Sequence, residues 1–232
     1  IGGFSGFAEM EHISQLFVDD YREGGFDTAK AGLFPIVADP PGTELNQAWL
    51  RFTGIENLDV KDGRQDLTYR KAPFHRFIGN VLWRQNWQTY DAISAKITPT
   101  KNATINFAYV DQVNRIFGDD APGAAARFEC ECFCINGNYQ GFKHVKLESY
   151  AYLLDIDNAA VNSTDTYGIL ANGAIPLNKI FKLIYAGEFA SQSDSGSNPL
   201  DIDANYYLGE IGLGIAVGQP FLKALILKFD YE

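Results

Sequence analysis

Three cysteines occupy alternate positions in one short segment of this 232-residue chain, at Cys130, Cys132 and Cys134. Three thiols invite a metal-binding interpretation, because cysteine is a preferred ligand of zinc. On a strand, however, alternate residues lie about 7 Å apart along one face, whereas zinc ligands converge to about 2.3 Å from the ion. The spacing therefore predicts no metal site. The cysteines are interpreted as small residues that face lipid or pack against neighbours.

Aspartates gather in long polar connections, and two pairs of them have the alternation of cation ligands. Asp155-x-Asp157 and Asp201-x-Asp203 could offer carboxylates to Ca²⁺, although neither has the full spacing of a calcium loop. The alternative is a set of solvated acidic loops at a cell surface. No serine–histidine–acid arrangement or glycine-rich phosphate loop stands in the context that it requires. The sequence thus predicts no enzyme, no catalytic residue and no cofactor.

Charge and hydropathy exclude two further classes of protein. The net charge is −10 and the sequence pI is about 4.7, which argues against nucleic acid as a partner. A transmembrane helix is not predicted, because no run of about 18 apolar residues exists. The mean hydropathy of −0.15 agrees instead with a transmembrane β-barrel, in which only every second strand residue faces lipid.

Short and long connections alternate along the chain, and between them apolar and polar residues alternate over about ten positions. Strands of this length can cross a bilayer. The pattern predicts an all-β fold, an antiparallel transmembrane β-barrel with about eleven visible strands in one domain over residues 1–232. The predicted strands are Gly3–Phe17, Leu45–Gly54, Leu58–Gln65, Thr89–Thr98, Ala103–Asp111, Ala126–Ile135, Val145–Leu153, Thr166–Ile175, Phe181–Phe189, Tyr207–Val217 and Leu225–Tyr231.

The sorting of connections by length predicts an orientation in the membrane. The long acidic loops are expected outside the cell, and the short turns are expected in the periplasm, near Glu56, Thr100, Gly137, Leu177 and Gln219. Tyrosine and tryptophan near strand ends are expected to form interfacial girdles. These aromatic residues are Trp49, Trp83, Trp87, Tyr90, Tyr109, Tyr167, Tyr206, Tyr207 and Tyr231.

An odd strand count predicts that the barrel is incomplete in this chain. Single-chain bacterial barrels usually have an even number of strands, and an open sheet edge cannot face lipid. The chain is therefore expected to be truncated at its C-terminus. Further chain, or a partner, would supply the missing strands.

Several segments resemble the alginate-export family of bacterial outer-membrane porins. The resemblance rests on Thr43–Leu50 (TELNQAWL), Gly63–Gln65, Arg76–Ala92, Tyr109–Pro122 and Tyr150–Asp155, and it extends from about Phe7 to the end of the chain. It implies a single-chain barrel, longer than 232 residues, in the outer membrane of a Gram-negative bacterium. In that family the alginate exporter lines its pore with arginines that attract a polyuronate.

Charged strand residues are the candidates for the pore lining of such a barrel. They would either set a transverse field across the lumen or form ordinary salt bridges in the wall. The candidates are Arg51, Lys61, Arg64, Lys96, Glu129, Glu131, Glu148 and Glu188.

The predicted function is a porin for passive diffusion of small polar or anionic solutes. Its expected partners are outer-membrane lipid and the solute, with a homo-oligomer or a larger membrane assembly left open. The alternatives are a structural barrel that scaffolds a membrane assembly and a soluble β-sandwich binding module.

Overall fold

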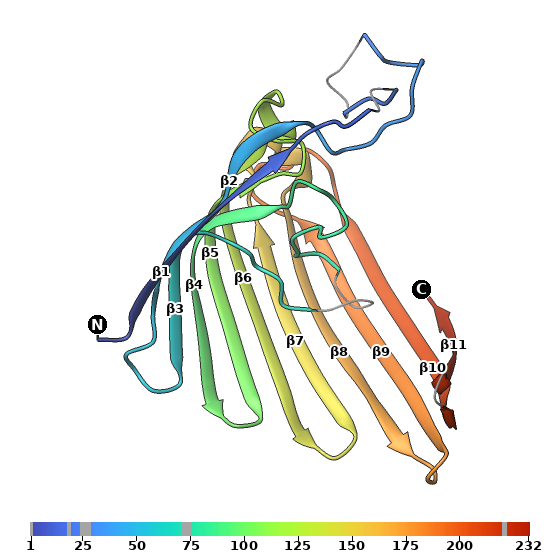
Figure 1. The fold of residues 1–232 in the computed structure, drawn as a ribbon. Coiled ribbons are helices and arrows are strands. Elements are labelled where there is room, and N and C mark those ends of the chain that lie inside the picture. Colours follow the sequence, from blue (N-terminus) through green and yellow to red (C-terminus); the bar gives the residue numbers. More distant parts are fainter. Residues whose placement is uncertain (1, 18–19, 24–28, 71–75, 220–221) are drawn as a thin grey trace.

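One antiparallel sheet dominates the computed structural model, which describes residues 2–17, 20–23, 29–70, 76–219 and 222–232. Its eleven strands follow one another in chain order, each hydrogen-bonded to the next (Figure 1). The strands are β1 (Phe4–Ile13), β2 (Gly42–Phe52), β3 (Leu58–Gln65), β4 (Thr89–Thr100), β5 (Ala103–Asn114), β6 (Arg127–Phe142), β7 (Val145–Leu154), β8 (Thr164–Pro176), β9 (Phe181–Asp194), β10 (Asp203–Gln219) and β11 (Leu222–Tyr231).

The all-β class and the number of strands predicted from the sequence are confirmed. Over the described residues the sheet is open, with β1 and β11 at its two edges. Because all strands belong to one sheet, the fold is not a β-sandwich. Two short 3-10 helices, η1 (Gly123–Ala125) and η2 (Asp157–Asn162), lie in long connections. No helix in the described part of the chain is long and apolar enough to cross a membrane.

The sheet curves into a trough, and its connections are sorted by length (Figure 1). The short connections after β2, β4, β6 and β8 lie at one end, while the long connections lie at the other end or enter the trough. The short connection after β10 includes residues 220 and 221, which are outside the described residues. The sheet therefore has an inner, concave face and an outer, convex face.

One predicted turn is wrong. Strand β6 continues through Gly137 to Phe142, and the turn falls at Lys143 and His144. The turn-forming asparagines before it are used on the inner face instead. Asn136 donates a hydrogen bond from Nδ2 to Oε1 of Glu148 at 2.7 Å and accepts one from Asn138 at 2.6 Å. The first of these bonds joins β6 to β7 and the second lies within β6, and together they outweigh the local preference of asparagine and glycine for a turn.

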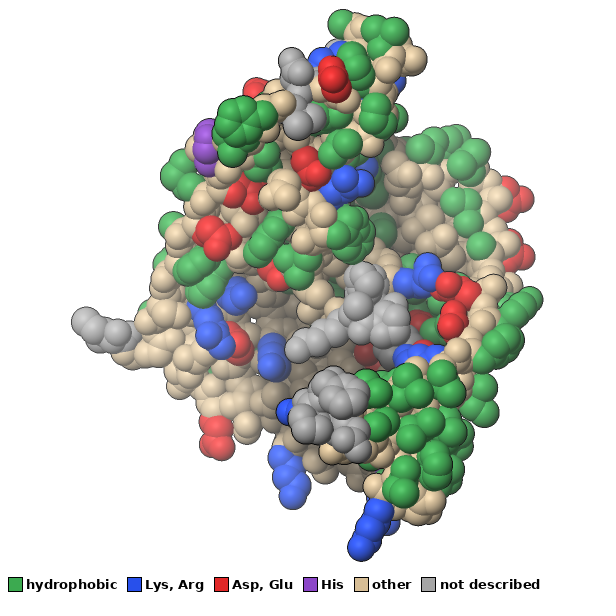
Figure 2. Space-filling model, turned by 45° about the vertical axis from the view of Figure 1, so that its right-hand side comes forward, with side chains coloured by type: hydrophobic (Ala, Val, Ile, Leu, Met, Phe, Trp, Pro, Cys, Tyr) green, Lys and Arg blue, Asp and Glu red, His purple; other side chains and the backbone are tan. Residues whose placement is uncertain are grey.

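The outer face is apolar over most of its height. Side chains on a strand point alternately to the two faces, and on the convex face large hydrophobic side chains are exposed in every strand from β4 to β11 except β7. Figure 2 shows hydrophobic side chains gathered over the last strands, where charged side chains border the hollow. Exposed apolar surface of this extent is typical of a face that contacts a membrane or another protein. The larger of these side chains include Ile105, Phe107, Phe133, Ile135, Ile169, Phe189, Ile211, Leu225, Leu227 and Phe229.

Four tyrosines border this apolar face toward the long connections. They are Tyr109, Tyr167, Tyr207 and Tyr231, and polar residues follow beyond three of them: Asp111, Asp165 and Asn205. This is the arrangement of an interfacial girdle. Of the other aromatic residues predicted for a girdle, Trp49, Tyr90 and Tyr206 lie on the inner face, and Trp83 and Trp87 lie in the connection between β3 and β4.

Candidate functional site

The described parts of the connection between β3 and β4, residues 66–70 and 76–88, fold into the trough and are here called the inner loop (Figure 1). Its Leu67 and Ile78 are buried against apolar side chains on the inner face of β4 to β7. An apolar patch would be unfavourable on the wall of a water-filled lumen, so the loop and the patch stabilise each other. The patch includes Tyr90, Ala92, Ala108, Val110, Cys130, Cys132, Cys134, Tyr150 and Tyr152.

The three cysteines lie beneath the inner loop, and all are buried and free. They line an apolar cavity of about 110 Å³ together with Ile78 and Val110. The interpretation of these cysteines as packing residues is confirmed, and the lipid-facing alternative is wrong. Across the described part of the chain, no group of three or more His, Cys, Asp or Glu side chains is placed to hold a metal ion.

Arg70 anchors the inner loop to the wall. Its Nε donates to Oε1 of Glu148 on β7, and its Nη1 donates to Oε1 of Glu188 on β9 at 2.7 Å. The guanidinium carbon lies 4.5 Å from the ring centroid of Tyr150, whose hydroxyl donates to Glu188 at 2.7 Å. Arg70 is only 5% exposed, so this ion pair is desolvated on both sides. A side chain of the loop thereby joins two strands that are not adjacent in the sheet.

The electrostatics of this anchor favour the charged arginine. Burial lowers the pKa of Arg70, but the hydrogen bonds and negative charges of Glu148 and Glu188 outweigh burial and raise the pKa above its ordinary value. One cation is thus shared by two carboxylates, and ionised together the three groups carry one net negative charge. Removal of the cation would leave two carboxylates facing each other in a desolvated site.

A second set of hydrogen bonds fixes the segment at Gly79 and Asn80. The Tyr90 hydroxyl donates to the carbonyl oxygen of Gly79 at 2.7 Å, and Gln88 Nε2 donates to the same oxygen at 3.0 Å. Asn80 Nδ2 donates to Oδ2 of Asp66 at 2.9 Å, which joins the two arms of the loop. Asn80 lies in Arg76–Ala92, one of the segments that resemble a porin family.

Aromatic contacts extend the inner loop toward the far edge of the sheet. The ring of Phe77 lies 5.6 Å from that of Tyr150 and 6.1 Å, edge-on, from that of Tyr206 on β10. Arg76 stacks over Tyr206 at 5.2 Å and forms an ion pair with Glu232. The loop therefore crosses the inner face from β4 to the end of β11.

A second charged cluster lies on the inner face near the short turns. Arg51 donates to both carboxylate oxygens of Asp59, from Nε at 2.7 Å and from Nη2 at 2.5 Å. Lys61 is the cross-strand partner of Arg51, and Lys96 is that of Asp59. The ammonium of Lys61 lies 4.7 Å from the ring centroid of Trp49. Three cations share one carboxylate, so this region of the wall is positive.

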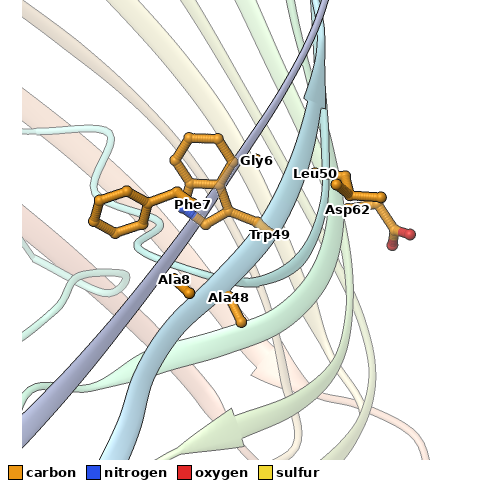
Figure 3. Close-up of a pocket in the computed structure, with 7 residues that line it drawn as sticks. All are labelled: Gly6, Phe7, Ala8, Ala48, Trp49, Leu50 and Asp62. Atoms are coloured by element: carbon orange, nitrogen blue, oxygen red, sulfur yellow. The ribbon is translucent and has the colours of Figure 1, made fainter.

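Figure 3 shows how the two faces separate at the β1 edge, around a shallow groove of about 540 Å³. The rings of Phe7 and Trp49 stack 5.3 Å apart on one side of β1 and β2, while Leu50 and Asp62 point away on the other side. Asp62 is paired across the ladders with Leu50 and Ile93. It is a charged residue on the outer face that the sequence-based assignment did not single out.

Five of the eight predicted pore-lining residues lie on the inner face, and three do not. Arg51, Lys61 and Lys96 belong to the positive cluster, whereas Glu148 and Glu188 bind Arg70. Arg64 lies on the face opposite to Lys61, because the two are separated by an odd number of positions, and it pairs with Asp91. Glu129 and Glu131 alternate with the buried cysteines and are exposed on the outer face. The sequence-based assignment of these three to the inner face is wrong.

The residues that sequence reasoning missed are Arg70, Tyr150 and Asp59. Arg70 and Asp59 are the charge partners of predicted residues, and Tyr150 completes the anchor. A signal for Arg70 exists in the sequence, because the connection around it is rich in apolar residues such as Leu67, Ile78 and Leu82, unlike a solvated loop. Nothing local in the sequence indicates which strands it would meet.

The open, curved antiparallel sheet with its apolar outer face matches part of the fold of solved outer-membrane porins. OccAB3 of Acinetobacter baumannii is one such solved structure: the TM-score is 0.61 at 15% identity, over 89% of this chain and 52% of that chain. Others are OccD3 (OpdP) of Pseudomonas aeruginosa (TM-score 0.57, 17% identity, 82% and 44%) and OpdK of Pseudomonas aeruginosa with vanillate (0.59, 12%, 79% and 46%).

The chain spans about half the length of the solved structures that it matches. No family model and no curated protein matches the chain. The likeness therefore supports the porin fold and does not support the alginate-export family specifically.

Proposed function

We propose that this chain forms part of the wall of an outer-membrane channel, through which small polar or anionic solutes diffuse passively. The observation that carries the proposal is the inner loop, held in the trough by Arg70 while the outer face stays apolar. A loop folded against the lumen side of a barrel narrows the passage and limits solute size. An apolar convex face suits contact with lipid.

In this proposal the long connections face the outside of a Gram-negative cell and the short turns face the periplasm. The acidic residues of the long connections, such as Asp119, Asp120 and Asp157, would then surround the entrance. The tyrosine girdle marks the outer boundary of the hydrocarbon region in this orientation. Expected partners are membrane lipid and the solute. In a homo-oligomer, each subunit would be a complete barrel of its own.

The charges of the inner face favour small solutes over a polyuronate. Arg70 is paired with two glutamates, and Arg51 is paired with Asp59. The positive region around Lys61 and Lys96 remains available to attract small anions by long-range electrostatics. OpdK, whose solved structure contains vanillate, illustrates a small organic solute in a barrel of similar fold. Alginate-like polymers are thus not the solutes that we propose.

Planar-bilayer recordings of the full-length protein test the proposal directly. Discrete single-channel steps are expected, together with a heat-dependent shift in gel migration that reports a folded barrel. A folded, heat-modifiable barrel that gave no conductance steps would refute the channel and favour a structural role in a membrane assembly. A protein without the heat-dependent shift would refute the barrel itself.

A further inference from the structure

The two arms of the inner loop line a half-open cavity of about 890 Å³, with Arg70 in its wall. This volume lies in the range of small-molecule sites, roughly 300–1,000 Å³. Aromatic and aliphatic side chains form much of its wall, and several are exposed: Phe77 by 40%, Leu82 by 56% and Trp83 by 67%. Thr68 and Asn80 add polar groups to the same wall. The cavity thus combines flat apolar surface with a few hydrogen-bonding groups.

The backbone of this cavity is held in conformations that non-glycine residues rarely adopt. Phe77 has φ of 70° and Val81 has φ of 55°, both in the left-handed region. Such a conformation is a marked outlier for a β-branched residue such as Val81. Strained residues persist where the surroundings over-determine them, and they cluster at ligand-binding sites. The hydrogen bonds that Tyr90 and Gln88 make to Gly79 hold this segment in place.

The charges that line the cavity are already engaged with one another. Arg70 is bound by Glu148 and Glu188. Asp66 accepts hydrogen bonds from Asn80 Nδ2 at 2.9 Å and from the Thr68 hydroxyl at 2.7 Å. An ionic ligand would have to compete with these pairs. A neutral ligand could keep them and use the remaining lone pairs of Asp66, Thr68 and Asn80.

We propose that this cavity binds a neutral, hydroxylated ring of monosaccharide size. The apolar face of the ring would stack on Trp83 and Phe77, and its hydroxyls would exchange hydrogen bonds with Thr68, Asn80 and Asp66. Aromatic side chains offer large, rigid contact area for such stacking. This inference rests on the proposed channel function for access of the solute to the cavity.

Equilibrium dialysis of the detergent-solubilised full-length protein against radiolabelled glucose tests the site without requiring conduction. Saturable binding is expected, with glucuronate and benzoate as weaker competitors than unlabelled glucose. Trp83→Ala is expected to weaken binding about 2- to 13-fold, as estimated for one aromatic contact. Thr68→Val is expected to weaken it by a similar factor, about 2- to 13-fold, through one hydrogen bond. Leu33→Ala, a truncation of an exposed apolar residue outside the cavity, is the matched control and should bind as the parent does.

Two results would overturn the inference. The first is that Trp83→Ala and Thr68→Val bind glucose as tightly as the parent protein does. The second is that benzoate or glucuronate displaces radiolabelled glucose more strongly than unlabelled glucose does. Because Trp83 and Thr68 are exposed, both variants should fold, and heat-dependent gel migration checks this. Failure of the channel proposal is distinguishable, since it would appear as absent conductance steps whatever the dialysis shows.

Discussion

Removal of the Arg70 anchor should displace the inner loop. Breaking a buried ion pair by removing one partner costs about 3–5 kcal/mol, because uncompensated charge stays behind. Burial of Leu67 or Ile78, the apolar contacts of the same loop, contributes about 1.5–3 kcal/mol each. Arg70 is thus its strongest single attachment. Arg70→Ala should shift the ratio of docked to displaced loop by about two to three and a half orders of magnitude.

Bilayer recording and thiol labelling are two independent measurements of this displacement. In bilayer recordings, single-channel conductance should rise because the lumen widens, and cation preference should increase because Glu148 and Glu188 become accessible. Cys130, Cys132 and Cys134, buried beneath the loop, should react faster with a thiol reagent. Both readouts are available in the same refolded protein.

The controls separate loss of the anchor from loss of fold. Arg76→Ala removes another arginine of the same loop, but its side chain is 48% exposed and such pairs contribute at most about 1 kcal/mol. It should leave conductance and labelling nearly unchanged. Adding Glu148→Gln and Glu188→Gln to Arg70→Ala should abolish the gain in cation preference. Unchanged conductance and unchanged labelling in Arg70→Ala would refute the anchor.

Three further predictions concern the wall. Ile135→Lys, placed on the outer face between Phe107 and Ala151, should lower the free energy of unfolding in vesicles by about 2–4 kcal/mol. Glu131→Lys, on the same face of β6, should change it by less than about 1 kcal/mol, and equal effects would contradict the assignment of the apolar face. Tyr90→Phe removes the hydroxyl that binds Gly79 and should lower the free energy of unfolding by about 1–3 kcal/mol. The gel-mobility shift should then occur at a lower temperature, and an unchanged temperature would contradict the role of this hydrogen bond in fixing the Gly79 segment. Lys96→Gln should move the reversal potential in a KCl gradient toward cation selectivity. Lys143→Gln, in the exposed turn between β6 and β7, is the control. Equal shifts in the two variants would exclude a role for the positive region around Lys61 and Lys96.

The strands themselves were predictable because their signal is local. Strand β3 begins and ends at the predicted residues, Leu58 and Gln65, since a tight turn precedes it and a change to irregular polar sequence follows. Strand β6 was predicted to end at Ile135, seven residues before its observed end at Phe142, because the sequence of Gly137 and its neighbouring asparagines is typical of a turn. The side chain of Asn136 binds Glu148 across the sheet, which is a tertiary contact that no local pattern reveals.

The orientation of β6 was not predictable from alternation alone. Alternation separates Glu129 and Glu131 from Cys130 and Cys132 correctly, but it does not say which set faces inward. The expectation that charges line a lumen assigned the wrong set. The inner loop covers this part of the inner wall and buries it. Apolar residues, not charged ones, are therefore favoured on the inner face of β6 at this point. The position of Arg70 against β7 and β9 likewise depends on contacts 78 and 118 residues away in sequence.

The four outward tyrosines also determine how steeply the strands are inclined. Strand pairing connects Tyr109 on β5, strand by strand, with Asp203 on β10. The intermediate partners are Phe133, Leu153, Asp165 and Ser193. The outward tyrosine of β10 is Tyr207, which lies four residues after Asp203 along that strand. Four residues are about 13 Å along a strand, and five strand spacings are about 24 Å. If the tyrosines are level in the proposed membrane, the strands slant by about 30° from its normal, close to the 35–45° of outer-membrane barrels. Residues that are paired across neighbouring strands would then lie at different depths in the membrane. A solute that moves down the lumen would meet the two members of such a pair one after the other.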